Sequence, residues 1–415
     1  MRRLLLGFFL LFAIPLSAQT IAIRAGNLID PASGFVTKNQ IILIKDQKIT
    51  AVGPTVDIPA GAQVIDLSNE WLMPGVIDSH THVTFLLPNM STPLEENYLE
   101  VSKGMRVLQG LKIAQTLLNA GITTIRDVGN EADYASVDVR NAINKGWFVG
   151  PTILTSGKII AAFGGQSAGV PPEEGPVWRF EYIDADGPWE IRKAVRQNIF
   201  YGADLIKLVS DNSDYFYSEE EIRAAADEAH KAGRALAVHC YKTEEADNVI
   251  NGGADSLEHG WHLTDDQLRL MKAKGTFLAG TEFPEAHFVQ GGYPDGKAVA
   301  AAAIDRLRRA NTIGVKMVFS TDIVTEMPGE SRADMTWDYL AGWRQAGVPP
   351  AAVLKAMTTN AAELLRIQKE RGAITAGLFA DIIAMPANPL DDTEALRKIN
   401  FVMKNGAVVR RDAVK

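Results

Sequence analysis

Two histidines, His80 and His82, lie two residues apart at the end of the stretch PGVIDSHTH, residues 74–82. In an extended strand, residues two apart point to the same side, with Cα atoms roughly 6.5–7 Å apart. Two imidazoles on one side of a strand can bind one cation from two directions. Taken alone, the pattern favours histidines that end a strand with ordinary hydrogen bonds. Other polar residues at strand ends are needed to decide.

Three further residues that can bind metal stand at the ends of apolar, strand-like runs. His239 ends ALAVH, His259 ends DSLEH, and Asp322 ends VFSTD. A lone histidine in such a place is more often satisfied by hydrogen bonds, and Asp322 alone could cap a helix. Together with His80 and His82 they form a set of nitrogen and oxygen ligands that suits Zn²⁺ or a similar divalent ion.

Lys207 lies inside the run LIKLVS, which we predict to be a strand buried on both faces. Burial disfavours the charged ammonium form. A neutral amine can add carbon dioxide, and the resulting carbamate offers an anionic oxygen to each of two cations. The alternative is a lysine paired with a buried carboxylate. We predict two divalent metal ions, with zinc as the first choice, and a carbamate on Lys207.

Eight apolar runs rich in β-branched residues alternate with helical periods between residues 73 and 370. They are GVIDSHTH, TTIRDVG, TILTSGK, LIKLVS, ALAVHC, DSLEHG, TFLAGTE and KMVFSTD. Strands separated by helices indicate a parallel sheet, and eight such units favour an α/β fold with a closed (β/α)8 barrel. An open, doubly wound sheet is the alternative. In a barrel the carboxyl ends of the strands meet at one mouth, so the six candidate ligands would converge there.

Residues 160–187 are rich in glycine and proline, and we predict that they form one long loop over this mouth. Residues 19–72 and 371–415 have a different pattern of short alternating runs broken by turns, including an Asn405-Gly406 hairpin pattern. Neither end has enough strands to fold alone. We therefore predict that the two ends together build one small β-sandwich beside the barrel.

The composition excludes some partners and suggests a location. Of 415 residues, 47% are hydrophobic, the net charge is −8, and Cys240 is the one cysteine. The chain has no basic face for nucleic acid and cannot form an internal disulfide. Residues 1–18 resemble a secretory signal peptide cut after Ala18, with an uncleaved anchor as the alternative. We predict an exported protein, periplasmic or secreted, with no membrane span after signal cleavage.

Taken in order, several motifs resemble one family over nearly the whole chain. PGVIDSHTH, LIKL, AVHCY, SLEHG, STD and the later MTTNAAELL are similar to those of the metal-dependent amidohydrolase superfamily, and within it to the exported imidazolonepropionase-like and Xaa-Pro dipeptidase-like branch. The resemblance implies a (β/α)8 barrel beside a small β-sandwich. One departure is Gly164-Gly165-Gln166-Ser167, where relatives often carry Gly-Gly-His-Gly. It removes an imidazole that could face the substrate.

The resemblance also implies roles for the candidate residues. His80 and His82 would bind the more buried metal, and His239 and His259 the more exposed one. Carboxylated Lys207 would bridge the two metals. Asp322 would bind the first metal and handle the proton. Tyr241, two residues after His239, matches a tyrosine that meets the substrate carboxylate in dipeptidase-like members, although it could equally pack at the rim.

The predicted function is therefore a binuclear metal-dependent hydrolase that cleaves a C–N amide bond with a metal-bridging hydroxide. Xaa-Pro dipeptides and N-acyl amino acids are the predicted small-molecule substrates. Lactone, ester or cyclic-amide hydrolysis at the same site is the alternative within enzymes, and a non-catalytic, metal-binding exported protein is the alternative outside them. The sequence leaves open whether the chain forms a homo-oligomer.

Overall fold

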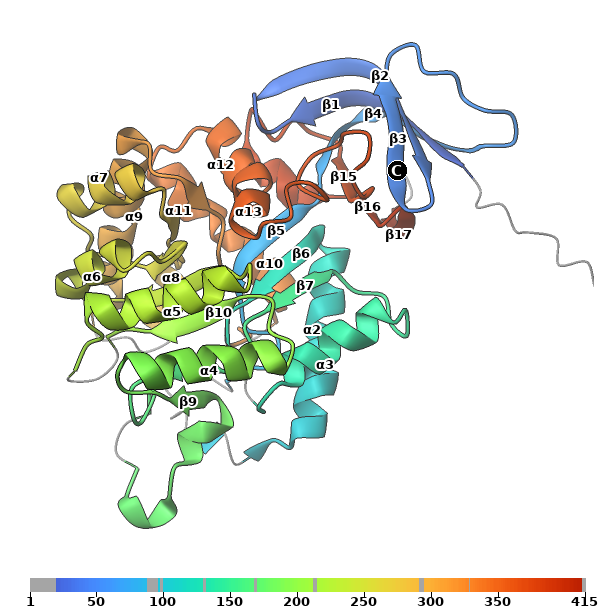
Figure 1. Cartoon of the computed structure of the whole chain (residues 1–415). Helices are drawn as coiled ribbons and strands as arrows, with labels where there is room; N and C mark the ends of the chain where they lie inside the picture. The colour runs from blue at the N-terminus through green and yellow to red at the C-terminus, as the bar shows by residue number, and fades with distance from the viewer. Residues whose placement is uncertain are drawn as a thin grey trace, which may run out of the picture.

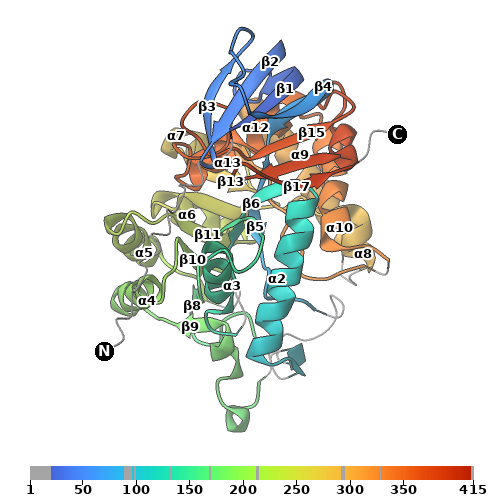
Figure 2. The same cartoon turned by 90° about the vertical axis from the view of Figure 1, so that its right-hand side faces the viewer.

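The structure is a computed structural model that describes residues 20–87, 96–97, 100–129, 132–167, 170–211, 215–290, 295–327 and 329–412. The predicted signal peptide, residues 1–18, lies outside the described residues, and export stays a prediction. A sheet built from both ends of the chain lies on one side of a larger α/β part (Figures 1 and 2). No helix among the described residues is long and apolar enough to cross a membrane.

Strands from the two ends of the chain form one seven-stranded sheet in the order β17-β16-β15-β4-β1-β2-β3. Within it, β4 pairs antiparallel with β15, so that Met73 lies opposite Ile383. The far strand β3 returns to the segment before β15, where Ile49 N donates to Leu378 O at 2.9 Å. The strands are β1 (Ile21–Asp30), β2 (Phe35–Lys45), β3 (Lys48–Gly53), β4 (Gln63–Pro74), β15 (Ile382–Met385), β16 (Phe401–Lys404) and β17 (Ala407–Arg411).

This sheet confirms that both ends of the chain build one β structure. Buried apolar side chains of β1, β2, β3, β4, β15 and β16 form one core, while others on the same strands, such as Met73 and Ile383, belong to the core of the α/β part. The predicted Asn405-Gly406 hairpin joins β16 to β17, and both residues have positive φ, 49° and 75°, as a two-residue hairpin turn requires. The division into a two-layer sandwich of residues 19–72 with 371–415 and a barrel of residues 73–370 stays a prediction.

The α/β part contains all eight predicted strands, and every strand pair in it is parallel. The strands lie in a sheet β5-β6-β7 and a sheet β14-β13-β12-β11-β10-β8-β9. Backbone bonds join the two sheets at both margins: Ser79 N donates to Phe319 O at 2.8 Å, and Asp204 N donates to Thr155 O at 2.7 Å. The arrangement is barrel-like. The strands are β5 (Val76–Thr81), β6 (Ile122–Asp127), β7 (Thr152–Thr155), β8 (Ile159–Ala161), β9 (Tyr182–Asp184), β10 (Ile206–Val209), β11 (Leu236–Cys240), β12 (Ser256–His259), β13 (Phe277–Ala279) and β14 (Met317–Val318).

Helices cover the outside of these strands (Figure 1). The predicted Ser218 capping box is present: Glu221 N donates to Ser218 Oγ, and Ser218 N donates to the Glu221 carboxylate. The α-helices are α2 (Lys103–Asn119), α3 (Ala135–Asn144), α4 (Pro188–Phe200), α5 (Glu219–Lys231), α6 (Ala246–Asn251), α7 (Asp265–Lys274), α8 (Glu285–Gln290), α9 (Gly296–Ile313), α10 (Arg332–Asp338), α11 (Leu340–Gln345), α12 (Pro350–Ala356) and α13 (Thr359–Leu364). The 3₁₀ helices are η1 (Pro172–Glu174), η2 (Val177–Phe180), η3 (Thr243–Glu245) and η4 (Thr393–Lys398).

The prediction of one long loop over residues 160–187 is wrong in part, because the segment holds η1, η2, β9 and the end of β8. The third strand position is divided. β7 pairs with β6, the chain bends at Gly157 with φ 65°, and β8 then pairs with β10. Strands of three residues carry too little alternation to stand out among glycines and prolines.

Candidate metal centre

All six predicted ligands lie at or near the carboxyl ends of the parallel strands. His80 is on β5 and His82 just follows it, Lys207 is on β10, His239 is on β11, and His259 is the last residue of β12. Asp322 follows β14. A nitrogen of His80, a nitrogen of His259 and an oxygen of Asp322 lie within 4.8 Å of one another. These three residues from the first, sixth and eighth predicted strands therefore form a candidate site for one cation.

The carboxylate of Asp322 lies near three of the four histidines. Its Oδ1 lies 3.1 Å from His82 Nε2 and 3.5 Å from His80 Nε2, and its Oδ2 lies 3.9 Å from His259 Nδ1. The ring centroids of His80 and His259 are 5.1 Å apart, and those of His239 and His259 are 4.5 Å apart. The rings of His80 and His82 are also in contact, so the four imidazoles form a continuous group, and Asp322 lies beside three of them.

Hydrogen bonds to outer groups orient three of the four imidazoles. The Nδ1 atom of His80 lies 2.7 Å from Glu258 Oε2, and that of His82 lies 3.0 Å from Gly129 O. The Nδ1 atom of His259 lies 2.8 Å from Thr281 Oγ1. With Nδ1 engaged, Nε2 of each ring is the nitrogen left to bind a metal, an arrangement usual for metal-binding histidines.

Burial keeps three of the imidazoles neutral, which is the form that binds metal. It lowers the pKa of His80 to about 4 and holds the pKa of His239 and of His259 well below the ordinary value. For His82 burial also lowers the pKa, but the bond to Asp322 outweighs it and raises the pKa. Neutral nitrogens beside one carboxylate are a donor set that fits a borderline divalent cation such as Zn²⁺.

Lys207 is buried, with 2% of its surface exposed. Burial lowers the pKa of its amine to about 8, although the carboxylates of Glu258 and Asp322 act in the opposite direction. None of the described carboxylates lies close enough to form an ion pair with Nζ. This does not support the alternative of a lysine held by a buried carboxylate. Burial is the main reason that the pKa of His80, His239 and His259 is lowered, and the charge on Lys207 adds to it, so the lysine lies near these three imidazoles.

A buried ion pair between Arg126 and Glu258 supports His80, whose Nδ1 contacts the Glu258 carboxylate. Arg126 on β6 donates from Nη2 to both oxygens of Glu258, at 2.9 and 2.8 Å, and from Nη1 to Ser256 Oγ at 2.9 Å. Burial raises the pKa of Glu258, but Arg126 and the bond from His80 outweigh it and hold this pKa below its usual range. Sequence reasoning missed this pair. The arginine inside the apolar run TTIRDVG could have revealed it, just as the lysine inside LIKLVS revealed Lys207.

Replacing Arg126 by methionine should lower the free energy of unfolding by about 3–5 kcal/mol, because it leaves the Glu258 carboxylate buried without its partner. Urea unfolding of chelator-treated protein measures this loss without a contribution from metal. Arg223→Met, which breaks an exposed pair with Glu219, is the matched control and should change stability little. Equal losses in the two variants would contradict a special role for the buried pair.

Three non-glycine residues at strand ends adopt left-handed backbone conformations. His259, Thr281 and Asp322 have φ of 68°, 45° and 56°. Such conformations are uncommon for residues with a Cβ and cost free energy, and they concentrate at functional sites. Here His259 and Asp322 carry candidate ligand atoms, and Thr281 bonds to the ring of His259.

Tyr241 lies directly beside the two histidines of the fifth and sixth strands. Its ring centroid is 4.1 Å from that of His239 and 4.7 Å from that of His259, and Trp261 packs at 4.7 Å from the same ring. The side chain is half-buried. Tyr241 therefore packs against two candidate ligands, and its role toward a substrate stays a prediction beside the alternative of packing at the rim.

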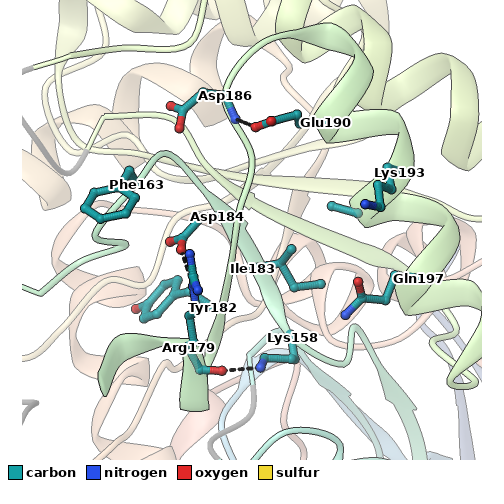
Figure 3. A pocket seen from close by; sticks show the side chains of 11 residues that line it. Lys158, Phe163, Arg179, Tyr182, Ile183, Asp184, Asp186, Glu190, Lys193 and Gln197 are labelled. Atoms are coloured by element: carbon teal, nitrogen blue, oxygen red, sulfur yellow. Dashed lines mark hydrogen bonds and ion pairs between the residues drawn. The ribbon is translucent and has the colours of Figure 1, made fainter. Parts of the chain in front are cut away.

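A separate cavity of about 680 Å³ lies between β9 and α4, and its lining includes Lys158, Arg179, Tyr182 and Asp184 (Figure 3). Arg179 Nε donates to Asp184 Oδ2 at 2.6 Å within it. None of the six candidate ligands lines this cavity. Tyr182 also donates to Gln166 Oε1 at 2.7 Å, so Gln166, in the segment where relatives often carry a histidine, is tied to β9.

Comparison with known proteins shows which family the chain resembles. The family model described as amidohydrolase family matches residues 71–409. Ochratoxinase from Aspergillus niger is 28% identical, over 95% of this chain and 87% of its own. Imidazolonepropionase from Thermoplasma acidophilum is 25% identical, over 88% of this chain and 87% of its own.

A solved structure gives a similar result. The crystal structure of a Xaa-Pro dipeptidase with bound methionine in the active site superposes with a TM-score of 0.82 and 27% identity, and covers 94% of this chain and 100% of its own. The family match spans most of the sequence, and the described part of the chain carries the candidate metal centre within that span. The chain belongs to the amidohydrolase family and is a hydrolytic enzyme.

Proposed function

We propose that the protein is a binuclear metal-dependent hydrolase that cleaves the C–N amide bond of a small carboxylate-bearing molecule, namely a Xaa-Pro dipeptide or an N-acyl amino acid. The observation that carries the proposal is the gathering of four buried histidines, Asp322 and a buried lysine without an ion-pair partner among the described residues, at one end of the parallel strands. We also propose that these strands close into one (β/α)8 barrel.

His80 and His82 would hold one cation together with Asp322, and His239 and His259 would hold the second. Lys207 would link them as a carbamate, which forms when the neutral amine nitrogen bonds to the carbon of carbon dioxide and loses a proton. Its burial and a pKa of about 8 favour the neutral amine that this step needs. Zinc is the proposed metal because the donors are imidazole nitrogens and carboxylate-type oxygens.

The protein's own residues then position the substrate and move the proton. When bound, the cations supply Lewis-acid chemistry that polarises the scissile carbonyl and lowers the pKa of water to about 7. Asp322 accepts the proton from the attacking water and passes it to the amide nitrogen as the bond between carbon and nitrogen breaks. Such general acid–base catalysis is worth typically 10²–10⁴-fold. The products are a carboxylate and a free amine.

Tyr241 would meet the carboxylate of the substrate through its hydroxyl group. Its ring lies against both His239 and His259, so a molecule bound between the histidines would lie within its reach. The similar structure described as a Xaa-Pro dipeptidase with bound methionine supports a substrate of amino-acid size. The proposed partner is therefore a small-molecule substrate, and nucleic acid has no role in the proposed reaction.

A substrate panel tests this proposal. Zn²⁺-loaded protein should hydrolyse Xaa-Pro dipeptides or N-acyl amino acids at least about 10²-fold more efficiently, in kcat/KM, than lactones and simple esters. Chelator-treated protein is the control and should recover activity when Zn²⁺ is returned. Faster turnover of lactones or esters than of any amide would favour the alternative reaction. Bound metal without hydrolysis of any compound would favour a metal-binding role.

We also propose that the protein is exported to the periplasm or the medium and that residues 1–18 are removed. N-terminal sequencing of the mature protein tests this directly, since cleavage after Ala18 leaves Gln19 as the first residue. A chain that begins at Met1 in the exported fraction would contradict it.

A further inference from the structure

His239 differs from the other three candidate histidine ligands, because no hydrogen bond to a described residue holds its ring from outside the site. The other three imidazoles have a partner on Nδ1 at 2.7–3.0 Å. For His239, Nε2 is buried without a hydrogen-bond partner among the described residues, and the carboxylate oxygen Oδ1 of Asp211 lies 3.6 Å from it. Asp211 Oδ1 is itself buried without a partner. Two unsatisfied polar atoms of complementary chemistry therefore face each other.

The rest of the Asp211 carboxylate is engaged with the backbone beside His239. Asp211 follows β10 and exposes 2% of its surface, and its Oδ2 accepts a hydrogen bond from the backbone N–H of Lys242. The backbone N–H of Tyr241 also donates to this carboxylate. One buried group thus contacts the segment that carries both His239 and Tyr241.

Buried polar atoms without partners are rare and costly, and a gap of 3.6 Å is roughly 0.4 Å beyond hydrogen-bond length. A small movement of the ring would let Nε2–H of His239 donate to Asp211. That bond would fix the tautomer with Nδ1 unprotonated. Nδ1 would then be the nitrogen that binds metal in His239, whereas it is Nε2 in the other three rings.

We propose that Asp211 is a positioning residue that holds His239, through its Nε2–H, in the orientation and tautomer that bind the second cation, and that it ties Tyr241 to the same group. This inference rests on the proposed function in one respect, the role of His239 as a ligand. Asp211 acts on His239 as Glu258 acts on His80, but on the opposite ring nitrogen.

The test is the affinity of each metal site in Asp211→Asn. The amide can still accept the backbone hydrogen bonds with its oxygen, but its NH₂ group then faces His239 Nε2 and favours the wrong tautomer. We expect the affinity for the second Zn²⁺ to fall about 10–100-fold, as for other outer partners of metal ligands, with the first ion retained. Competition with a chromophoric chelator measures both affinities. Asp211→Ala should show the same selective loss.

Asp204→Asn is the matched control, because Asp204 lies just before β10, at the end opposite Asp211, and pairs with Arg140. It should bind both ions with unchanged affinity. Circular dichroism of chelator-treated proteins checks folding independently of metal. If Asp211→Asn binds two ions as tightly as the wild type, or loses both ions or its fold, the positioning role is wrong. A wild-type chain that binds no second ion would instead overturn the proposed function.

Discussion

Lys207→Ala is expected to lower kcat/KM at least about 10³-fold and to reduce bound metal below two ions per chain. The reason is that this variant removes the proposed anionic link between two cations, a larger loss than the 10–100-fold typical of an outer partner. Lys207 is buried and has no carboxylate within ion-pair distance among the described residues, so its removal breaks no salt bridge there. Metal analysis and kinetics measure the two effects.

Rescue of Lys207→Ala by short carboxylic acids tests the bridging role more specifically. Acetate or propionate can occupy the space left by the side chain and supply two oxygens, so both should restore part of the activity. Lys404→Ala is the matched control. Lys404 is also a buried lysine, and burial lowers its pKa to about 8, but it lies on β16 of the sheet built from both chain ends and pairs with Asp381. It should lose stability and keep its metal. Two tightly bound ions in Lys207→Ala would contradict the bridge.

Asp322→Asn should retain some metal and lose about 10²–10⁴-fold in kcat, because an amide cannot accept and return the proton. Burial raises the pKa of Asp322, but His80, His82 and Lys207 outweigh it and lower this pKa. The carboxylate form is the active one, so the wild-type rate should fall as the pH drops through this pKa. The pH–rate profile of Asp322→Asn should lack this fall at low pH. Near-wild-type turnover would rule out the proton-transfer role.

The sequence was enough to predict that His80, His259 and Asp322 lie together, because the candidate residues break a strong pattern. Lys207 and His239 stand in or at the end of runs that are otherwise apolar, and a parallel α/β arrangement brings such strand ends together. The structure brings His80, His259 and Asp322 together although more than 240 positions separate the first from the last. The pairing of the two chain ends followed from a simpler argument, since neither had enough strands to fold alone.

The supporting residues could not be predicted in the same way. Glu258 is next to His259 in the sequence but bonds to His80, 178 residues away, because alternate residues of β12 face different neighbours. Asp211 is an ordinary loop aspartate in the sequence, and its position facing His239 depends on how the chain turns after β10. Helices α10 to α13 were not predicted, and they are short and follow one another closely. Such features depend on packing between distant segments more than on local pattern.

The pairing of β4 with β15 has a consequence for biosynthesis. Strands β1 to β4 can pair as soon as they leave the ribosome, but one edge of β4 has no partner until β15 is made, roughly 300 residues later. At a synthesis rate of about 5–20 residues per second, that edge of β4 stays unpaired for roughly 15–60 s. An open strand edge is a template for pairing with other chains. During that interval the nascent protein would depend on chaperones or on delayed collapse, and truncation of the last forty residues would leave this edge permanently exposed to aggregation.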